Sequence, residues 1–200
     1  MLFRSSQSLA GRTGQELNAS SLSGDVGVSV NTIRAWLSVL EASYLITLLP
    51  AWHPNSRKQA VKAPKLHFLD SGLACHLLGI RSPEQLATHP LRGAIFESWM
   101  VSEILKSRLH RGLPARMHHY REARGPEVDL LVDSEEGWIL AEAKSGSTVD
   151  ASFFRHMDLL AGRLPEERPI QKRLIHGGGE SYLRQAVAVI GWRRIQGQPW

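Results

Sequence analysis

Apolar residues recur at helical spacing through most of residues 1–63. A helix is expected over residues 3–11, ending before Gly14. Asn18, Ser20 or Ser21 can cap a short second helix, and Ser29 can cap a longer third one. In that third helix the apolar positions are Val30, Ile33, Trp36, Leu37 and Leu40. A strand-prone run over residues 44–49 and a basic loop follow. This order predicts a winged helix-turn-helix over residues 1–63.

The pattern changes from Pro64 onwards, where strand-like and helix-like runs alternate. Helices are expected over residues 70–78, 91–109 and 151–161, with a connector over residues 82–89. Strands are expected over residues 65–69, 116–121, 127–133, 138–144, 173–176 and 187–190. Residues 64–200 are therefore predicted to form an α/β domain with a mixed sheet.

Two neighbouring strands in that domain carry charged residues at alternating positions. Side chains alternate across a strand, so Glu127 and Asp129 are expected on one face, and Glu142 and Lys144 share a face on the next strand. A tight turn over residues 134–137 gives a hairpin in which residue 133 opposes 138 and residue 129 opposes 142.

The register places the carboxylates of Asp129 and Glu142 opposite each other. Like charges in that position destabilise a hairpin, so a cation is the expected partner, and oxygen ligands favour Mg²⁺ or Mn²⁺. Lys144 would stand beside the ion. A plainer alternative stays open, in which the carboxylates form a solvated face and Glu127 makes a cross-strand ion pair with Lys144.

Glu97 lies on an apolar face of the predicted long helix. Its neighbours three and four positions away are Gly93, Ala94, Met100 and Val101. A carboxylate there is costly unless it is paired or bound to metal, so Glu97 is a further candidate for the metal site. The alternative partner is an arginine such as Arg121 or Arg124.

Composition and charge narrow the class of protein. The chain has 200 residues, 42% of them hydrophobic, a net charge of +5 and one cysteine. These values fit a globular chain and exclude a disulfide scaffold or a thiolate zinc site. No apolar run reaches the roughly 18 residues of a membrane span, and the start lacks a signal-peptide pattern. We therefore expect a cytoplasmic protein outside the membrane, whose basic charge suits a polyanion such as DNA.

The predicted third helix and the basic loop supply the candidate DNA contacts. The helix turns polar side chains outward, and the loop adds positive charges that suit phosphate groups. The expected contacts are Asn31, Thr32, Arg34, Arg57, Lys58 and Lys62. Many winged helices bind proteins instead, so a protein-interaction role stays open.

Asp129 followed by Glu142-Ala143-Lys144 resembles the PD-(D/E)XK nuclease signature, and Glu97 matches the upstream acid of that signature. More widely, residues 8–190 resemble the C-terminal region of a prokaryotic AAA+ ATPase family, a domain of unknown function that is grouped with this restriction-endonuclease-like fold. The matching stretches, in the family's order, are LAGRTGQELNASSLSGDVGVSVNTIRAWLSVLEASYLI, KAPKLHFLDSGLACHLLG, GAIFESW, YREARGPEVDLL and ILAEAKSG.

The resemblance implies a specific role for each of these residues. Asp129, Glu142 and the Ala143 carbonyl would hold Mg²⁺ or Mn²⁺, Lys144 would serve the attacking water, and Glu97 would assist. Members of the family carry an ATPase domain upstream. No stretch here fits G-x-x-x-x-G-K-[ST], so no nucleotide site is expected in this chain. An ATPase domain or partner subunit is expected to supply that activity.

Two functions follow from these observations. The first is metal-dependent hydrolysis of DNA phosphodiester bonds at the hairpin. The second is a non-catalytic module that binds DNA or protein for an AAA+ ATPase.

Overall fold

The computed structural model describes residues 2–53, 62–122, 125–165 and 167–200. The chain divides into two compact units, and the division falls twice along the sequence. The N-terminal unit comprises residues 1–49 and 63–102, and the C-terminal unit comprises residues 50–62 and 103–200. This division differs from the boundary predicted after residue 63, because the strand at residues 65–68 pairs with strands that precede residue 50.

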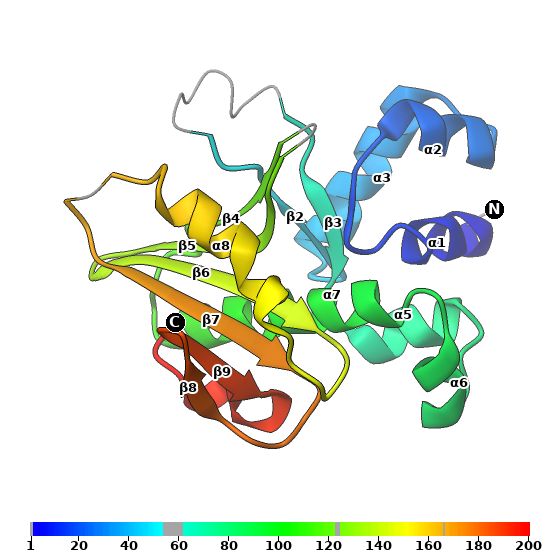
Figure 1. Cartoon of the computed structure of the whole chain (residues 1–200). Coiled ribbons are helices and arrows are strands. Elements are labelled where there is room, and N and C mark those ends of the chain that lie inside the picture. The colour runs from blue at the N-terminus through cyan, green and yellow to red at the C-terminus, as the bar shows by residue number, and fades with distance from the viewer. Residues whose placement is uncertain (1, 54–61, 123–124, 166) are drawn as a thin grey trace. The chain divides into compact units, whose positions relative to one another are not determined.

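The N-terminal unit combines helices with a small antiparallel sheet of order β1-β3-β2 (Figure 1). Its elements along the chain are α1 (Leu2–Ala10), β1 (Gln15–Glu16), α2 (Ala19–Val26), α3 (Val30–Ala42), β2 (Ile46–Leu49), β3 (Lys65–Phe68), α5 (Ser71–Leu77), α6 (Pro83–Thr88) and the first part of α7 (Arg92–His110). A buried cluster that includes Leu22, Ile33, Leu37, Leu66 and Phe68 forms its core.

Side-chain caps start the helices of this unit where the sequence predicts them. Asn18, Ser29 and Asp70 each accept a hydrogen bond from the backbone N–H three residues later. The connector predicted over residues 82–89 is wrong, because α6 forms there. Ser82 caps α6, and Pro83 occupies its first turn, where a missing N–H costs nothing.

The C-terminal unit is built on a mixed six-stranded sheet of order β4-β5-β6-β7-β9-β8. Its elements are β4 (Met117–Arg121), β5 (Glu127–Ser134), β6 (Gly137–Lys144), the 3₁₀ helix η1 (Ala151–Phe154), α8 (Arg155–Ala161), β7 (Ile170–His176), β8 (Tyr182–Arg184), β9 (Val187–Gly191) and the 3₁₀ helix η2 (Trp192–Gly197). Strands β6, β7 and β9 run parallel to one another, and the other pairings are antiparallel. The predicted α/β class with a mixed sheet is confirmed.

One face of this sheet is covered by α8 (Figure 1). Met157 and Leu160 of α8, together with Phe154, pack against Leu140 of β6 and Leu174 of β7. These side chains are at most 2% exposed, so the centre of the sheet is a rigid support for the residues at its strand ends. In the described part of the chain, no helix is both long enough and apolar enough to cross a bilayer.

Candidate functional site

The predicted metal-binding residues lie on the β5–β6 hairpin. Ser134 pairs with Gly137, Asp133 with Trp138, and the pairing continues to Leu130 with Ala141. The predicted opposition of residues 133 and 138 is therefore confirmed. Gly137 has φ 141° and a Cβ there would lie 2.2 Å from the Pro169 carbonyl oxygen, so the turn into β6 requires glycine.

A bulge interrupts β5 at the candidate site. His118 pairs with Leu131 and Tyr120 pairs with Val128, so Asp129 and Leu130 together stand opposite the single residue His119. Val128 and Leu131 accordingly belong to the same buried cluster, which a strict two-residue alternation would separate. The alternation predicted along this strand breaks at Asp129, and such bulges commonly redirect a side chain beside an active site.

The bulge leaves Asp129 beside the end of β6. Its Oδ2 accepts a hydrogen bond from the backbone N–H of Ala143 at 2.9 Å. Next to it, Oε2 of Glu142 accepts a hydrogen bond from Nζ of Lys144 at 3.1 Å. The structure therefore brings Asp129, Glu142, Ala143 and Lys144 together. The side chains of Glu142 and Lys144 share a face, as the alternation along β6 predicts.

Glu142 is the buried member of this group. Only 4% of the residue is exposed, and Oε1 has no hydrogen-bond partner among the described residues. Burial raises the pKa of Glu142 well above its usual range, and the charge of Asp129 raises it further, while Lys144 acts in the opposite direction. A buried carboxylate oxygen without a partner fits a metal ligand, because a divalent cation would satisfy it.

The donor set within this group is small. Two carboxylates and the Ala143 carbonyl are available, and in the described part of the chain no three His, Cys, Asp or Glu side chains are grouped to hold a metal. Mg²⁺ is commonly bound through one or two carboxylates with water completing its shell, so a two-carboxylate site remains chemically sound.

Lys144 stands at the carboxyl end of a parallel strand. It lies level with His176 on β7, and its Nζ is 5.5 Å from the centre of the Phe153 ring. About a third of the Lys144 side chain is exposed, so the ammonium group can reach a ligand while it contacts Glu142. Ligands of α/β sheets bind at this end of the strands. Glu127 is the residue that the sequence offered as an alternative partner of Lys144. Its Oε2 lies 3.7 Å from Nε of Arg121, with which it forms an ion pair.

Glu97 belongs to the N-terminal unit, whereas the hairpin belongs to the C-terminal unit. Its Oε1 lies 3.0 Å from Nζ of Lys65, which is 2% exposed, and 4.0 Å from Nε2 of His67. The cost of placing Glu97 on an apolar helical face is thus offset at least in part by the buried Lys65. Arg124 lies outside the described residues.

The predicted DNA contacts fall into three groups. Asn31 and Arg34 are exposed on α3. Thr32 is half-buried, and its backbone N–H and hydroxyl both contact Ser29. Lys62 belongs to the C-terminal unit, where its Nζ donates to the Arg121 carbonyl at 3.0 Å. The predicted contacts Arg57 and Lys58 lie outside the described residues.

His176 is a neighbour of the site that the sequence did not indicate. It is 3% exposed, and its ring contacts the carbonyls of Ser147 and Glu180, which lie in the loops after β6 and β7. Gly177 follows, and a Cβ there would meet the Ser145 carbonyl at 2.3 Å. The glycine run after β7 therefore permits close packing of the two loops beside Lys144. No sequence pattern marks a histidine at a strand end as one that joins two neighbouring loops, so His176 could not be predicted.

Two family matches cover the chain. Residues 92–195 match the family described as Domain of unknown function (DUF4143), and residues 2–84 match the family described as Domain of unknown function (DUF8612). No solved structure matches the chain significantly.

Two curated relatives are known from mycobacteria. The chain is 27% identical over 125 residues to "Uncharacterized protein Mb2031c" of Mycobacterium bovis and to "Uncharacterized protein Rv2008c" of Mycobacterium tuberculosis. The matched region is 62% of this chain, and it spans 27% of the length of each relative. Because the match to DUF4143 covers just over half of the residues, this chain belongs to that family, whose domain is associated with AAA ATPases.

Proposed function

We propose that the β5–β6 hairpin binds Mg²⁺ or Mn²⁺ and hydrolyses phosphodiester bonds in DNA. The observation that carries the proposal is the pair of carboxylates at Asp129 and Glu142. Glu142 is buried with one unsatisfied oxygen, and a second negative charge lies beside it. Such an arrangement is costly by itself, and a divalent cation is the partner that would remove the cost.

The residues of the hairpin are proposed to have different roles in the reaction. Asp129, Glu142 and the Ala143 carbonyl would hold the ion, which when bound acidifies a water and polarises a phosphoryl oxygen. The Asp129 side chain is oriented by the Ala143 N–H, and Glu142 is oriented by Lys144. Lys144 is proposed to position the attacking water and to stabilise negative charge on the phosphate. Glu97 remains the proposed assisting acid.

The N-terminal unit is proposed to bind DNA as a winged helix-turn-helix. The element order α1-β1-α2-α3-β2-β3, with β3 between β1 and β2, supports this interpretation. Asn31 and Arg34 are exposed on α3, the proposed recognition helix. Thr32 is a further proposed contact on that helix. Arg57, Lys58 and Lys62, which fall in the C-terminal unit, are proposed separately as contacts to phosphate groups.

We propose that the protein is cytoplasmic and that it acts together with an ATPase. The chain spans about a quarter of the length of its curated relatives, so an ATPase domain in the same longer protein, or in a partner subunit, is proposed as the source of ATP hydrolysis.

The second candidate is a non-catalytic module that binds DNA or protein for such an ATPase. One observation favours it: Lys144 already contacts Glu142, and this contact partly neutralises the carboxylate without a metal. The two functions differ in their requirement for a divalent ion, which makes them separable.

The test is nicking of supercoiled plasmid DNA in Mn²⁺ by the wild-type protein and by Lys144→Ala. We expect cleavage by wild type and a loss of about 10²-fold or more in the variant, the scale for removal of one charge-stabilising group. Lys106→Ala is the matched control, since Lys106 is half-exposed and pairs with Glu103 on α7. Cleavage that survives in Lys144→Ala would contradict the assigned role. Wild-type protein that neither binds Mn²⁺ nor cleaves DNA would favour the second candidate.

A further inference from the structure

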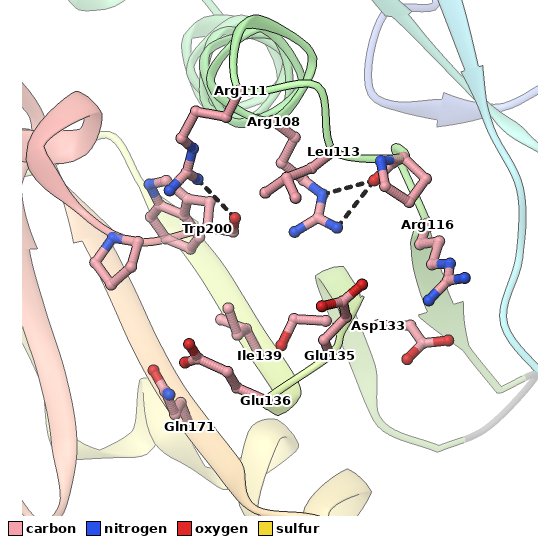
Figure 2. A pocket seen from close by; sticks show the side chains of 13 residues that line it. Arg108, Arg111, Leu113, Arg116, Asp133, Glu135, Glu136, Ile139, Gln171 and Trp200 are labelled. Carbon is pink, nitrogen blue, oxygen red and sulfur yellow. Dashed lines mark hydrogen bonds between the residues drawn. The ribbon is translucent and has the colours of Figure 1, made fainter.

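A pocket of about 150 Å³ lies in the C-terminal unit at the turn end of the β5–β6 hairpin (Figure 2). It has room for about five water molecules, by their share of liquid volume. Figure 2 shows Arg108, Arg111 and Arg116 on one side of the space and the side chains of Glu135 and Glu136 on the other. The pocket is distinct from the proposed metal site, because Asp133 and Asp129 are four residues apart on β5, or about 13 Å.

Arg108, Arg111 and Arg116 form the basic side of the pocket, and Arg108 is its buried member. It is 3% exposed, and its Nε and Nη2 donate to the Pro114 carbonyl at 3.0 and 2.9 Å. Within the described residues, Nη1 forms no further hydrogen bond. Burial lowers the pKa of Arg108, and the charges of Arg111 and Arg116 lower it further, while the charge of Asp133 acts in the opposite direction. Three like charges close enough to influence one another favour a bound anion between them.

Arg116 supplies a second, independent observation. It has φ 39°, in the left-handed region that residues other than glycine rarely adopt. Its backbone is fixed there because its carbonyl accepts a hydrogen bond from the Asp133 N–H at 2.9 Å. No hydrogen bond or ion pair joins its guanidinium to another described residue. Strained backbone that presents an unengaged charged group at a pocket is typical of binding sites.

The local carboxylates offset the three arginines only in part, and the charge of Asp133 raises the pKa of Arg108. Asp133 accepts a hydrogen bond from Arg168 at 2.8 Å, and Glu135 and Glu136 are exposed at the hairpin turn. These acidic residues would repel a nucleic-acid backbone, which carries a charge at every nucleotide. A small ligand with one anionic group brings fewer negative charges near these carboxylates, and Trp200 and Ile139 give it apolar surface.

We propose that this pocket binds the carboxylate or phosphate group of a small ligand, with Arg108, Arg111 and Arg116 as its cationic contacts. Guanidinium groups suit this task because their paired N–H donors match the geometry of both oxyanions. The proposal does not depend on metal binding or DNA cleavage at the other end of the hairpin.

The experiment is calorimetric titration of the full chain with inorganic phosphate and, separately, with acetate. We expect saturable binding of one equivalent of at least one probe, and the probe that binds more tightly identifies the anionic group. Arg116→Gly removes the guanidinium and relieves the left-handed strain, so the affinity should fall ten-fold or more while the thermal midpoint is unchanged or higher. Arg155→Ala is the control, since Arg155 is an exposed arginine on α8.

The outcomes are distinct. Binding that is lost in Arg116→Gly and kept in Arg155→Ala supports the pocket. Binding that persists in Arg116→Gly overturns the assignment, and so does the absence of saturable binding of either probe to the wild-type chain.

Discussion

Glu142 lies between a second carboxylate and a lysine, and these neighbours act on its charge in opposite directions. Burial and Asp129 favour the protonated form, whereas Lys144 favours the ionised form. A carboxyl group with a strongly raised pKa at the carboxyl end of a parallel strand is a feature of functional sites, because its cost to stability is otherwise unexplained.

The raised pKa of Glu142 predicts how the metal-free protein responds to pH. The folded state holds the Glu142 proton at pH values where the unfolded chain has lost it, so stability falls as pH rises from the usual glutamate range through the folded-state pKa. Glu142→Gln has no such proton to lose. In EDTA, the urea midpoint of the variant should therefore rise relative to wild type between pH 5 and pH 8. Parallel pH profiles for the two proteins would contradict the raised pKa.

Asp129→Asn tests the repulsion between the two carboxylates. The asparagine oxygen can still accept the hydrogen bond from the Ala143 N–H, so the hairpin geometry should survive while the charge is removed. We expect the free energy of unfolding in EDTA to increase by roughly 0.2–1 kcal/mol, the scale of cross-strand pairs. Stabilisation by Mn²⁺ should be lost in the same variant. Asp158→Asn, which removes a carboxylate paired with Lys172, is the control and should show no such increase. An unchanged midpoint with and without Mn²⁺ would count against the carboxylate pair.

At the scale of residues, the sequence predicted local relationships better than distant ones. Asp129, Glu142 and Lys144 belong to one hairpin, so its short turn was enough to predict that they lie close together, although the alternation predicted for β5 breaks at Asp129. Lys65 and Glu97 are far apart in the sequence and meet only through tertiary packing. The apolar face around Glu97 indicated that a partner was needed, and no sequence pattern could identify Lys65.

The β5–β6 hairpin depends on a turn of two acidic residues, Glu135 and Glu136, followed by Gly137. The carbonyl of Pro169 comes so close to Gly137 that no side chain fits, and it also accepts the Trp138 N–H at 2.8 Å. These contacts hold the start of β7 beside the hairpin turn. They therefore fix both the register of β5 with β6 and the parallel pairing of β6 with β7.

Gly137→Ala should therefore destabilise the whole C-terminal unit. The new Cβ would collide with backbone, and alanine is strained at φ 141°, so we expect a loss of about 1–3 kcal/mol in the free energy of unfolding. Gly146→Ala is the matched control, because nothing lies within 4 Å of a Cβ at that position. Urea denaturation of both variants makes the comparison. Equal midpoints would show that the close approach at Gly137 does not constrain the sheet.

At the scale of elements, capping and periodicity predicted most helices, because these signals are local. The bulge at Asp129 could not be predicted, since it depends on the pairing of β5 with β4. β8 was also missed. All of its residues are exposed, and its turn uses Gln185 and Ala186 at positive φ where a glycine signal would be expected.

At the scale of the whole molecule, β3 explains why the predicted boundary after residue 63 differs from the two structural units. The pattern of the chain changes at Pro64, but β3 completes its sheet with β1 and β2, which come from the first 49 residues. Long-range strand pairing of this kind leaves no trace in composition. The mixed sheet itself was predictable, because strands alternating with helices favour parallel pairing and the tight hairpin favours antiparallel pairing.

The central claim is a divalent-cation site built on Asp129 and Glu142, and Mn²⁺ titration calorimetry of the full chain tests it most directly. We predict one saturable site in the wild-type protein, at least ten-fold weaker binding in Glu142→Gln, and unchanged binding in Glu167→Gln, which alters an exposed carboxylate of the same unit. Wild-type protein without saturable Mn²⁺ binding, or equal affinities for wild type and Glu142→Gln, would contradict the claim.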